Sequence, residues 1–478
     1  MLNLPSNKLG LLGGVLYSVI LSAAIYLEFM WLALLPVVAA LAWAAIKRVD
    51  IFMGALLMAV PVSLNLQEFS YQLIGLYMPT EPMLAILLCL FVLRSLKGYP
   101  VDKKILFHPV SIVISLMMLW MGIVTITSWD YVVSLKFMIS RAWFIVGFFY
   151  FLGHIFLHNK KYRENMILLM LFPLTIVIVY TIIRHAGHGF SKHAGHWMMK
   201  PFFKDHTSYG AVLAMFFPPA VAMLFRKDRP EFLKVLLSIT TTILGLGIVL
   251  SFTRAAWVSL VGVAAIYAAM RLGFKLKTLL VLSSVVLGGI LLNKDSVIME
   301  MQRNKQDSSD NLTEHIESIS NVSSDDSNLE RLNRWNCAIS LFKERPITGW
   351  GPGTYQFVYA PYQEASYKTN ISTNNGDGGN AHSEYLGPLA EQGILGGVFI
   401  LLLLWYATVI GFRLWENMPE GYDRNFAVSI YLGLMTYFVH GVLNNYLDTD
   451  KASAPFWGFL ALLVVFDLEL KRKNQLTS

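Results

Sequence analysis

Three residues in the second half of the chain could act on a phosphorylated substrate: Arg254, Arg331 and His382. Arg254 lies in Ser251-Phe-Thr-Arg-Ala-Ala-Trp257, a very short turn between two apolar stretches, where a charge is costly and usually functional. Arginine is always charged and binds phosphate oxygens in a bidentate manner, so two arginines could bind an anionic group. His382 titrates near neutral pH, and it could either remove a proton from an acceptor hydroxyl or only orient that acceptor.

Two predicted helix starts would place Arg331 and His382. Ser327 followed by Glu330 has the pattern of a capping box. The helix that follows would carry an apolar stripe at spacings of three and four, which we expect to rest on a membrane domain, and its members are Leu332, Trp335, Ile339 and Phe342. Asn380 is a good N-cap and would place His382 in the first turn of a second helix, where free N–H groups favour a negative ligand.

Four further residues are weaker candidates for substrate contacts. Lys204 and His206 come just before an apolar stretch and could make a second phosphate or sugar contact. Arg141 and Arg334 are cations expected on or near the same side as the three main candidates. For most such cations taken singly, a solvated or lipid-headgroup contact is the more ordinary interpretation.

The composition predicts an all-α polytopic membrane protein. Of 478 residues, 55% are hydrophobic and 14% are charged, whereas about 25% are charged in soluble domains. A membrane core takes about 20 apolar residues per helix. This measure predicts about 12–14 transmembrane helices, near residues 9–27, 29–46, 51–66, 82–94, 110–128, 138–157, 165–183, 207–225, 233–252, 255–270, 278–293, 394–412, 425–443 and 455–470.

One long polar segment, residues 294–391, interrupts these stretches and divides the chain into three parts. Residues 1–293 are the N-terminal transmembrane helices, 294–391 are a large and partly helical loop, and 392–478 are the C-terminal transmembrane helices. Non-helical backbone is not tolerated in lipid, so chemistry is expected in this loop or in a cavity that it caps.

The formal net charge of +7 is explained by membrane topology, and no nucleic acid is expected as a partner. Basic residues cluster in short links between apolar stretches, which is typical of cytoplasmic loops. One orientation places every cluster inside, namely 47–48, 94–104, 160–163, 226–229, 271–277, 413–424 and 471–473. The 294–391 loop then lies on the outer side of the membrane, and the lipid bilayer is a partner.

No metal or cofactor is expected. Cys89 and Cys337 are too few for a disulfide framework. Four histidines within 185–196 have a spacing at which zinc or copper could bind, but they lie in a glycine-rich link, where a mobile loop or an acceptor contact is the preferred interpretation. Asp448-Thr-Asp450 resembles a metal-binding Asp-x-Asp, without an adjoining nucleotide-binding fold, and is interpreted as a polar link between helices.

The chain resembles the O-antigen ligase/polymerase superfamily, which includes O-antigen ligases, O-antigen polymerases and O-linked protein oligosaccharyltransferases. The resemblance covers roughly residues 200–470, and in the N-terminal half only the hydrophobic frame is similar. Its motifs are Ser251 to Trp257, Arg331 four residues before Trp335, Arg345-Pro-Ile-Thr-Gly-Trp-Gly-Pro-Gly-Thr-Tyr355, Ala381-His-Ser-Glu-Tyr-Leu386 and Ala390-Glu-Gln-Gly-Ile-Leu-Gly396. Two departures occur, because Thr253 stands where the family usually has Ser and Ser383 where Asn is common.

The resemblance implies an inverting, metal-independent transfer of a glycan from undecaprenyl diphosphate to an acceptor hydroxyl, on a frame similar to the GT-C membrane glycosyltransferases. It also implies a multi-pass protein of the bacterial inner membrane whose active site faces the periplasm. The family's essential arginines match Arg254 and Arg331, and its essential histidine matches His382. Tyr385 and Glu391 lie in its motifs and become further candidates for substrate contacts.

The acceptor is left open by the sequence. Ligation of O-antigen to lipid A-core is favoured slightly, because the loop is one compact block. A polymerase of O-antigen or exopolysaccharide and an O-linked protein oligosaccharyltransferase are the alternatives within the enzyme class. A polysaccharide transporter or flippase and a non-catalytic scaffold are the alternatives outside it. A transporter would be expected to show inverted repeats and charges near the bilayer midplane.

Overall fold

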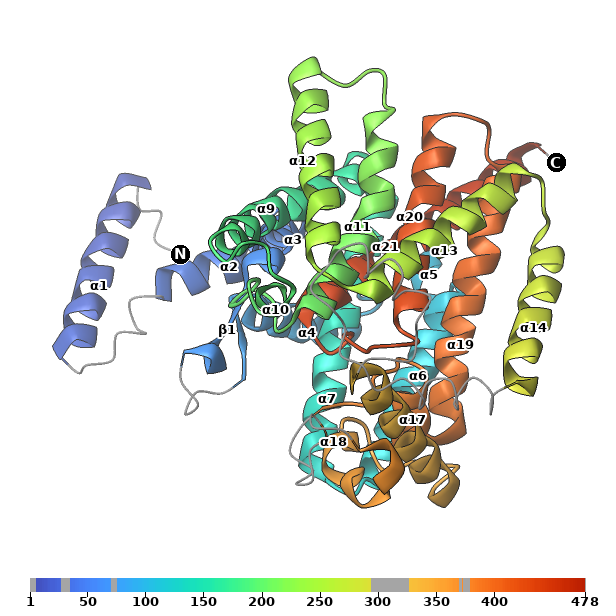
Figure 1. The fold of residues 1–478 in the computed structure, drawn as a ribbon. Coiled ribbons are helices and arrows are strands. Elements are labelled where there is room, and N and C mark those ends of the chain that lie inside the picture. The colour runs from blue at the N-terminus through green and yellow to red at the C-terminus, as the bar shows by residue number, and fades with distance from the viewer. Residues whose placement is uncertain are drawn as a thin grey trace.

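The structure is a computed structural model, and it describes residues 6–26, 35–69, 75–293, 326–368, 372 and 379–477. These residues form a helical bundle with a smaller cap of short helices at one end (Figure 1). The beginning of the predicted large loop, residues 294–325, lies outside the described part of the chain.

Helices account for nearly all regular structure. The first half contains α1 (Ser6–Tyr26), α2 (Leu35–Lys47), α3 (Val49–Ala59), α4 (Thr80–Ser95), α5 (Lys103–Leu106), α6 (Pro109–Ile126), α7 (Tyr131–Phe144), the π-helix η4 (Ile145–Phe151), α8 (Leu152–His158), α9 (Lys161–Ala186) and α10 (Lys192–Gly195). The second half contains α11 (His206–Leu224), α12 (Glu231–Leu250), α13 (Arg254–Arg271), α14 (Leu276–Leu292), α17 (Asp326–Glu344), α18 (Tyr355–Val358), α19 (Leu386–Asn417), α20 (Tyr422–His440) and α21 (Asp450–Thr477).

Short elements connect these helices. The 3-10 turns are η2 (Val60–Val62), η3 (Leu66–Glu68), η5 (Ala360–Tyr362) and η6 (Ala365–Tyr367). Strands β1 (Leu64–Asn65) and β2 (Tyr77–Met78) pair in an antiparallel register, with Leu64 opposite Met78 and Asn65 opposite Tyr77. We call residues 64–69 and 75–78 the hairpin.

The structure confirms the predicted all-α polytopic membrane fold. Each of the fourteen predicted spans overlaps a helix of the described residues. Seven helical segments of the described chain are long and apolar enough to cross a membrane, namely Pro109–Ile126, Tyr131–His158, Lys161–Ala186, His206–Leu224, Glu231–Leu250, Leu386–Asn417 and Asp450–Lys473. The second of these continues through η4, so that α7, η4 and α8 form one long span.

Helices α20 and α21 form the centre of the bundle. Most side chains of α21 are buried, and its Trp457 is 1% exposed. Helices α11 and α13 pack against α20, and α8 and η4 pack against α21. This packing fixes the positions of α20 and α21, and with them the segments that precede and follow each helix.

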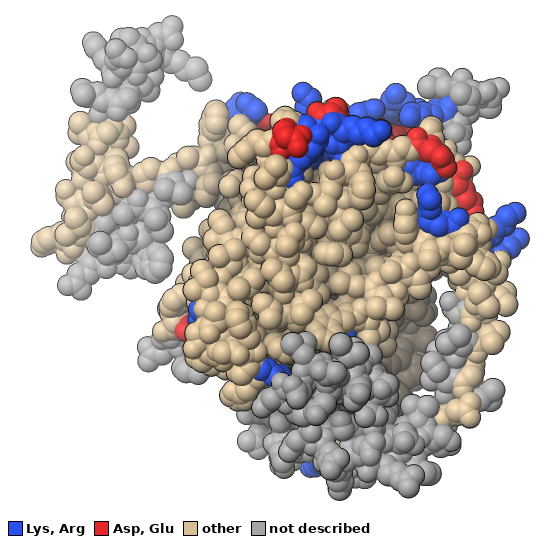
Figure 2. Space-filling view, turned by 45° about the horizontal axis from the view of Figure 1, so that its top comes forward, with Lys and Arg blue, Asp and Glu red and all other residues tan. Residues whose placement is uncertain are grey.

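Charged residues gather at one end of the bundle. Figure 2 shows Lys and Arg side chains along that end and an almost uncharged surface beside it. Four predicted cytoplasmic clusters, 226–229, 271–277, 413–424 and 471–473, lie in the links α11–α12, α13–α14 and α19–α20 and in the last turns of α21. This arrangement agrees with the predicted grouping of the basic links on one side.

Helix α17 buries a different stripe from the predicted one. Ile339 is 37% exposed, and the buried side chains are Glu330, Asn333, Arg334, Cys337, Ala338 and Leu341. The chain after the helix folds back onto this side, because the Tyr355 hydroxyl donates to the Arg334 carbonyl oxygen over 2.8 Å. Polar side chains with partners thus displace the predicted apolar stripe, and the helix packs on its own loop as well as on α19.

Helix α19 is interrupted at Gly393, whose φ of 68° and ψ of −164° are not helical. The interruption leaves three carbonyl oxygens without helical donors, and other groups bond to them. Trp350 N donates to the carbonyl oxygen of residue 390 over 3.2 Å, and Gly351 N donates to that of residue 391 over 2.8 Å. Trp120 Nε1 donates to that of residue 392 over 2.9 Å. The interruption thus joins the loop, α6 and α19 at one point.

We expect Gly393→Ala to destabilise the protein by roughly 2–4 kcal/mol. A Cβ atom at this position would lie 2.0 Å from the Ile347 carbonyl oxygen, and the positive φ disfavours any side chain. Thermal unfolding in detergent checks the prediction, with Gly397→Ala of the same helix as the control, since a Cβ there meets only the flexible Leu389 side chain. Equal unfolding midpoints for the two variants would contradict it.

Candidate active site

One large cavity, with a volume of about 750 Å³, collects most of the polar residues at the end of the bundle opposite the basic links. Its size falls in the range of about 300–1,000 Å³ that is usual for small-molecule sites. Its walls come from the hairpin, from residues 200–208 at the start of α11, from the turn 379–382, and from residues 445–452 at the start of α21. Segments far apart in the sequence therefore share one space.

His382 lines this cavity from a strained turn. Its φ is +49°, a value rare for a residue with a side chain and often found at functional sites. The Asn380 Oδ1 accepts from the His382 backbone N over 3.1 Å, and the Trp335 Nε1 donates to the His382 carbonyl oxygen over 3.3 Å. These contacts hold the turn on α17.

The prediction of a helix beginning at Asn380 is wrong, because α19 begins at Leu386. The backbone N of Glu384, which such a helix would bond to the Asn380 carbonyl, donates instead to the Gly441 carbonyl oxygen over 2.7 Å. Asn380 caps a turn of its own, and Ser383 Oγ accepts from the backbone N of Tyr385 and of Leu386. His382 is thus held in a turn before the helix.

Arg331 approaches the same turn from α17. Its Nε donates to the Leu443 carbonyl oxygen over 3.3 Å, two residues before Asn445 in the cavity wall. Burial and the positive charges of Arg331 and Arg334 lower the pKa of His382 to about 4, although Glu330 and Asp205 act in the opposite direction. The imidazole is therefore neutral at physiological pH and able to accept a proton.

The start of α11 supplies a second group of polar residues. Lys204 and Asp205 both line the cavity. Asp205 caps the helix, and its Oδ1 accepts from Ser208 N and from Thr207 Oγ1, each over 2.7 Å. The Thr207 hydroxyl in turn contacts the Tyr446 hydroxyl across the cavity wall. The His206 ring stacks on that of His196, with centroids 4.2 Å apart.

Arg254 joins this group through its neighbour in the sequence. It is the first residue of α13, and the Thr253 Oγ1 donates to the His206 carbonyl oxygen over 2.8 Å. Of the three main candidates, only His382 is among the described residues that line the large cavity. Arg331 acts electrostatically on His382, whereas Arg254 is linked to the start of α11 only through the bond between Thr253 and His206. The structure thus associates Arg331 with His382 and does not place Arg254 on the cavity surface.

Two of the weaker candidates make contacts within the loop. Arg334 is 4% exposed, and its Nε donates to Glu330 Oε1 over 2.6 Å within α17. Glu391 Oε1 accepts from Tyr355 N over 3.0 Å. Both contacts support the fold of the loop, and the effect of Arg334 on the site is exerted through the electrostatic lowering of the His382 pKa.

The other two weaker candidates lie deeper in the bundle. The Tyr385 hydroxyl donates to the Phe438 carbonyl oxygen over 2.9 Å. Arg141 lies 5.2 Å from the centre of the Phe137 ring and lines a small separate cavity of about 20 Å³ together with Glu384. Such a space holds about one water molecule, so it is not a second substrate site.

Glu384 is a functional element that the sequence did not reveal. Its Oε1 accepts from the Tyr437 hydroxyl, from Tyr446 N and from Leu447 N over 2.5, 2.8 and 3.0 Å. The side chain therefore joins the His382 turn to α20 and to the link before α21. Burial raises the pKa of Glu384, and its three donors compensate for that burial. In the sequence, Glu384 was only one residue of a family motif, and no pattern indicated which residues it would contact.

The sequence also did not assign the hairpin or residues 445–452 to the site. The hairpin lies in the N-terminal half, where the chain is similar to the family only in its hydrophobic frame. The one available signal was the polar run Asn65-Leu-Gln-Glu68 between two apolar stretches. Asp450, interpreted as part of a polar link, is instead the buried first residue of α21 and is 0% exposed.

We expect transfer activity to show no inflection near pH 6.5, because His382 already has a pKa near 4 in the free protein. With His382 neutral, kcat/KM stays level from about pH 8 to about pH 5 and falls only as the pH approaches 4, where Arg331, Arg334, Glu330 and Asp205 surround a newly protonated ring. The measurement is a pH profile of glycan transfer by purified protein. A loss of activity centred near pH 6.5 would show that the ring is not in this environment.

Comparison with known proteins gives one family match. A search of curated proteins finds no match. Residues 239–401 match the sequence model of a family described as O-antigen ligase. The matched segment contains Arg254, Arg331 and His382, whereas the hairpin, Lys204 and residues 445–452 lie outside it. The match confirms the chain's resemblance to the O-antigen ligase/polymerase superfamily.

Proposed function

We propose that the protein is a GT-C-like membrane glycosyltransferase that moves a glycan from undecaprenyl diphosphate to an acceptor hydroxyl at the periplasmic face of the bacterial inner membrane. The preferred reaction is the inverting, metal-independent ligation of O-antigen to lipid A-core. The observation that carries the proposal is His382, a neutral imidazole in a strained turn that lines a large cavity beside Arg331. The family match over the same residues agrees with it.

In the proposed reaction the acceptor oxygen attacks the anomeric carbon of the donor. The bond from that carbon to the diphosphate oxygen breaks, and its electron pair leaves with undecaprenyl diphosphate. The acceptor proton passes to the free nitrogen of His382. Arg254 and Arg331 stabilise the charge that develops on the leaving diphosphate, and Lys204 on the cavity wall adds a third cation.

The charges of the site fit this order of events. Before the donor binds, burial together with Arg331 and Arg334 keeps the imidazole neutral, as a base must be. A bound diphosphate would neutralise nearby positive charge and raise the pKa of His382, so proton acceptance becomes easier once the substrate is in place. His206, beside Asp205 and stacked on His196, is proposed as a sugar or phosphate contact.

The location of the cavity favours an enzyme over a polysaccharide transporter or flippase. Its walls come mainly from links and helix starts, namely 65–69, 200–205, 379–382 and 445–449. A transporter would be expected to concentrate its polar site at the bilayer midplane. A polymerase and an O-linked protein oligosaccharyltransferase would use the same donor chemistry, so the acceptor has to be identified by experiment.

We expect Arg331→Ala to reduce glycan transfer roughly 10²- to 10³-fold, because it removes a cation from the developing diphosphate charge. The assay uses purified protein in detergent with lipid-linked donor and acceptor, and without a membrane gradient. Lys343→Ala is the matched control, since Lys343 is an exposed cation of the same helix α17. Similar activity of the two variants, or solute movement without transfer, would contradict the proposed reaction.

A deletion strain identifies the acceptor when its surface glycans are resolved by gel electrophoresis. For the preferred ligase reaction we expect loss of the whole lipid A-linked ladder with lipid A-core intact, because each chain of the ladder requires one ligation. Collapse of the ladder to a single repeat unit would assign a polymerase instead. Secreted proteins without glycans beside a normal ladder would assign a protein transferase.

A further inference from the structure

The cavity is larger and more varied than a diphosphate and one reacting hydroxyl require. Away from His382 its surface is made by the hairpin, by residues 200–203 and by residues 445–451. We call these three segments the far wall. They lie outside the segment that matches the O-antigen ligase family, which runs from 239 to 401.

We propose that the far wall is a saccharide-binding subsite that holds sugar rings not involved in bond formation. A pyranose ring presents apolar C–H faces and an edge of hydroxyl groups, so it is recognised by aromatic rings together with amides, carboxylates and cations. The far wall offers all of these groups within one cavity. The proposal deepens the proposed function and rests on it, because it names a region that would recognise the glycan of that reaction.

Aromatic rings supply the apolar part. Phe69, Tyr77, Phe202 and Phe203 line the cavity. Phe69 is 64% exposed, although a phenyl ring usually gains by burial. Tyr77 is held against Lys451, whose Nζ lies 4.8 Å from the centre of the ring. An exposed ring on the wall of a polar cavity suits a ligand with an apolar face.

Amide groups supply the polar part. Asn65, Gln67 and Asn445 line the cavity, and each amide offers both donors and an acceptor to a hydroxyl group. The Asn65 Oδ1 is already used by the backbone N of Gln67 over 3.0 Å. The Asn445 Oδ1, in contrast, is buried and accepts no hydrogen bond within the described structure. A buried acceptor without a donor is costly, and a ligand hydroxyl would satisfy it.

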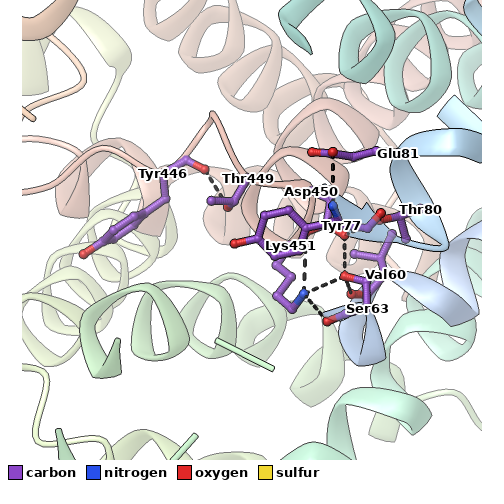
Figure 3. A network of polar contacts seen from close by, with 9 residues as sticks. All are labelled: Val60, Ser63, Tyr77, Thr80, Glu81, Tyr446, Thr449, Asp450 and Lys451. Carbon is purple, nitrogen blue, oxygen red and sulfur yellow. Dashed lines mark hydrogen bonds and ion pairs between the residues drawn. The ribbon is translucent and has the colours of Figure 1, made fainter. Parts of the chain in front are cut away.

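A buried polar network holds the far wall in place (Figure 3). Asp450 Oδ2 accepts from Ser63 Oγ and from Thr80 Oγ1 over 2.5 and 2.7 Å. Lys451 Nζ donates to the carbonyl oxygen and to Oγ of Ser63 over 2.9 and 2.6 Å. Asp450 and Lys451 are 0% and 4% exposed.

This network joins both ends of the hairpin to the start of α21. Ser63 lies just before β1, Thr80 lies just after β2, and Asp450 and Lys451 are the first two residues of α21. Binding surfaces that are ordered in advance lose less conformational entropy when a ligand arrives. The far wall is thus prepared for a ligand before that ligand binds.

The test measures binding of a saccharide without any transfer. The probe is the oligosaccharide released by mild acid from the producing cell's own surface polysaccharide, and saturation-transfer NMR detects it on the full-length protein in detergent. We expect Phe69→Ala and Gln67→Ala each to weaken binding roughly three- to tenfold. Phe69→Trp retains a stacking face and should keep most of the affinity.

Tyr131→Ala is the matched control, because Tyr131 is an aromatic residue at the start of α7 that is 54% exposed and is not among the described residues lining the cavity. Equal affinities of Phe69→Ala and Tyr131→Ala, in preparations that unfold at the same temperature, would overturn the proposal. Loss of affinity in Phe69→Trp equal to that in Phe69→Ala would also overturn it.

The same variants separate the two possible sources of the saccharide. A raised KM for the lipid-linked donor assigns the far wall to the donor glycan, and a raised KM for the acceptor assigns it to the acceptor glycan. If no glycan transfer is found but the oligosaccharide binds in a Phe69-dependent manner, the proposed function fails and the saccharide subsite stands. If transfer is found and both KM values and binding are unaffected in Phe69→Ala, the subsite fails and the function stands.

Discussion

The arrangement of the site depends on one buried carboxylate. Glu384 Oε1 accepts three hydrogen bonds, from the Tyr437 hydroxyl and from the backbone N of Tyr446 and Leu447. A buried polar group that loses its hydrogen-bond partners costs about 1–3 kcal/mol. The turn that carries His382 therefore cannot move independently of the wall that carries Tyr446. The His382 turn and the far wall are positioned by the same group.

A second constraint comes from the interruption of α19. Gly393 interrupts the helical hydrogen bonding near the start of α19. The carbonyl oxygens of residues 390–392 accept hydrogen bonds from the loop and from α6 instead. The carboxylate before α19 and the glycine within it thus fix the loop at two points about ten residues apart along the chain. Between these points the side chains of Tyr385 and Glu391 add one hydrogen bond each to the backbone bonds.

The sequence predicted the helical frame and the family resemblance well, because both leave strong local signals. Twenty-residue apolar stretches specify helices through burial alone. Arg254, Arg331 and His382 were recognisable because their residue types match a chemical need and a family pattern, and the segment that contains them matches that family. His206 and Lys204 were named from a short polar run, and the structure places Lys204 on the cavity.

What the sequence could not supply was the result of long-range packing. The buried side of α17 was predicted from apolar spacing, but Glu330 and Arg334 neutralise each other and so tolerate burial. The start of α19 was misplaced because the backbone N of Glu384 bonds to Gly441, a partner 57 positions away. Asp450 was noticed only as part of an Asp-x-Asp pattern, and Ser63, Thr80 and Lys451 gave no signal, since their bonds join residues that are 370 to 388 positions apart.

The composition of the cavity walls has a consequence for biosynthesis. The lining residues run from Asn65 in the first part of the chain to Ala452 in the last helix. A nascent chain that has inserted its earlier helices still lacks Tyr446, Asp448 and Lys451, so it has no complete cavity. The cavity is thus complete only when α21 is in place, and incomplete translation products in the membrane cannot bind a ligand that needs all of its walls.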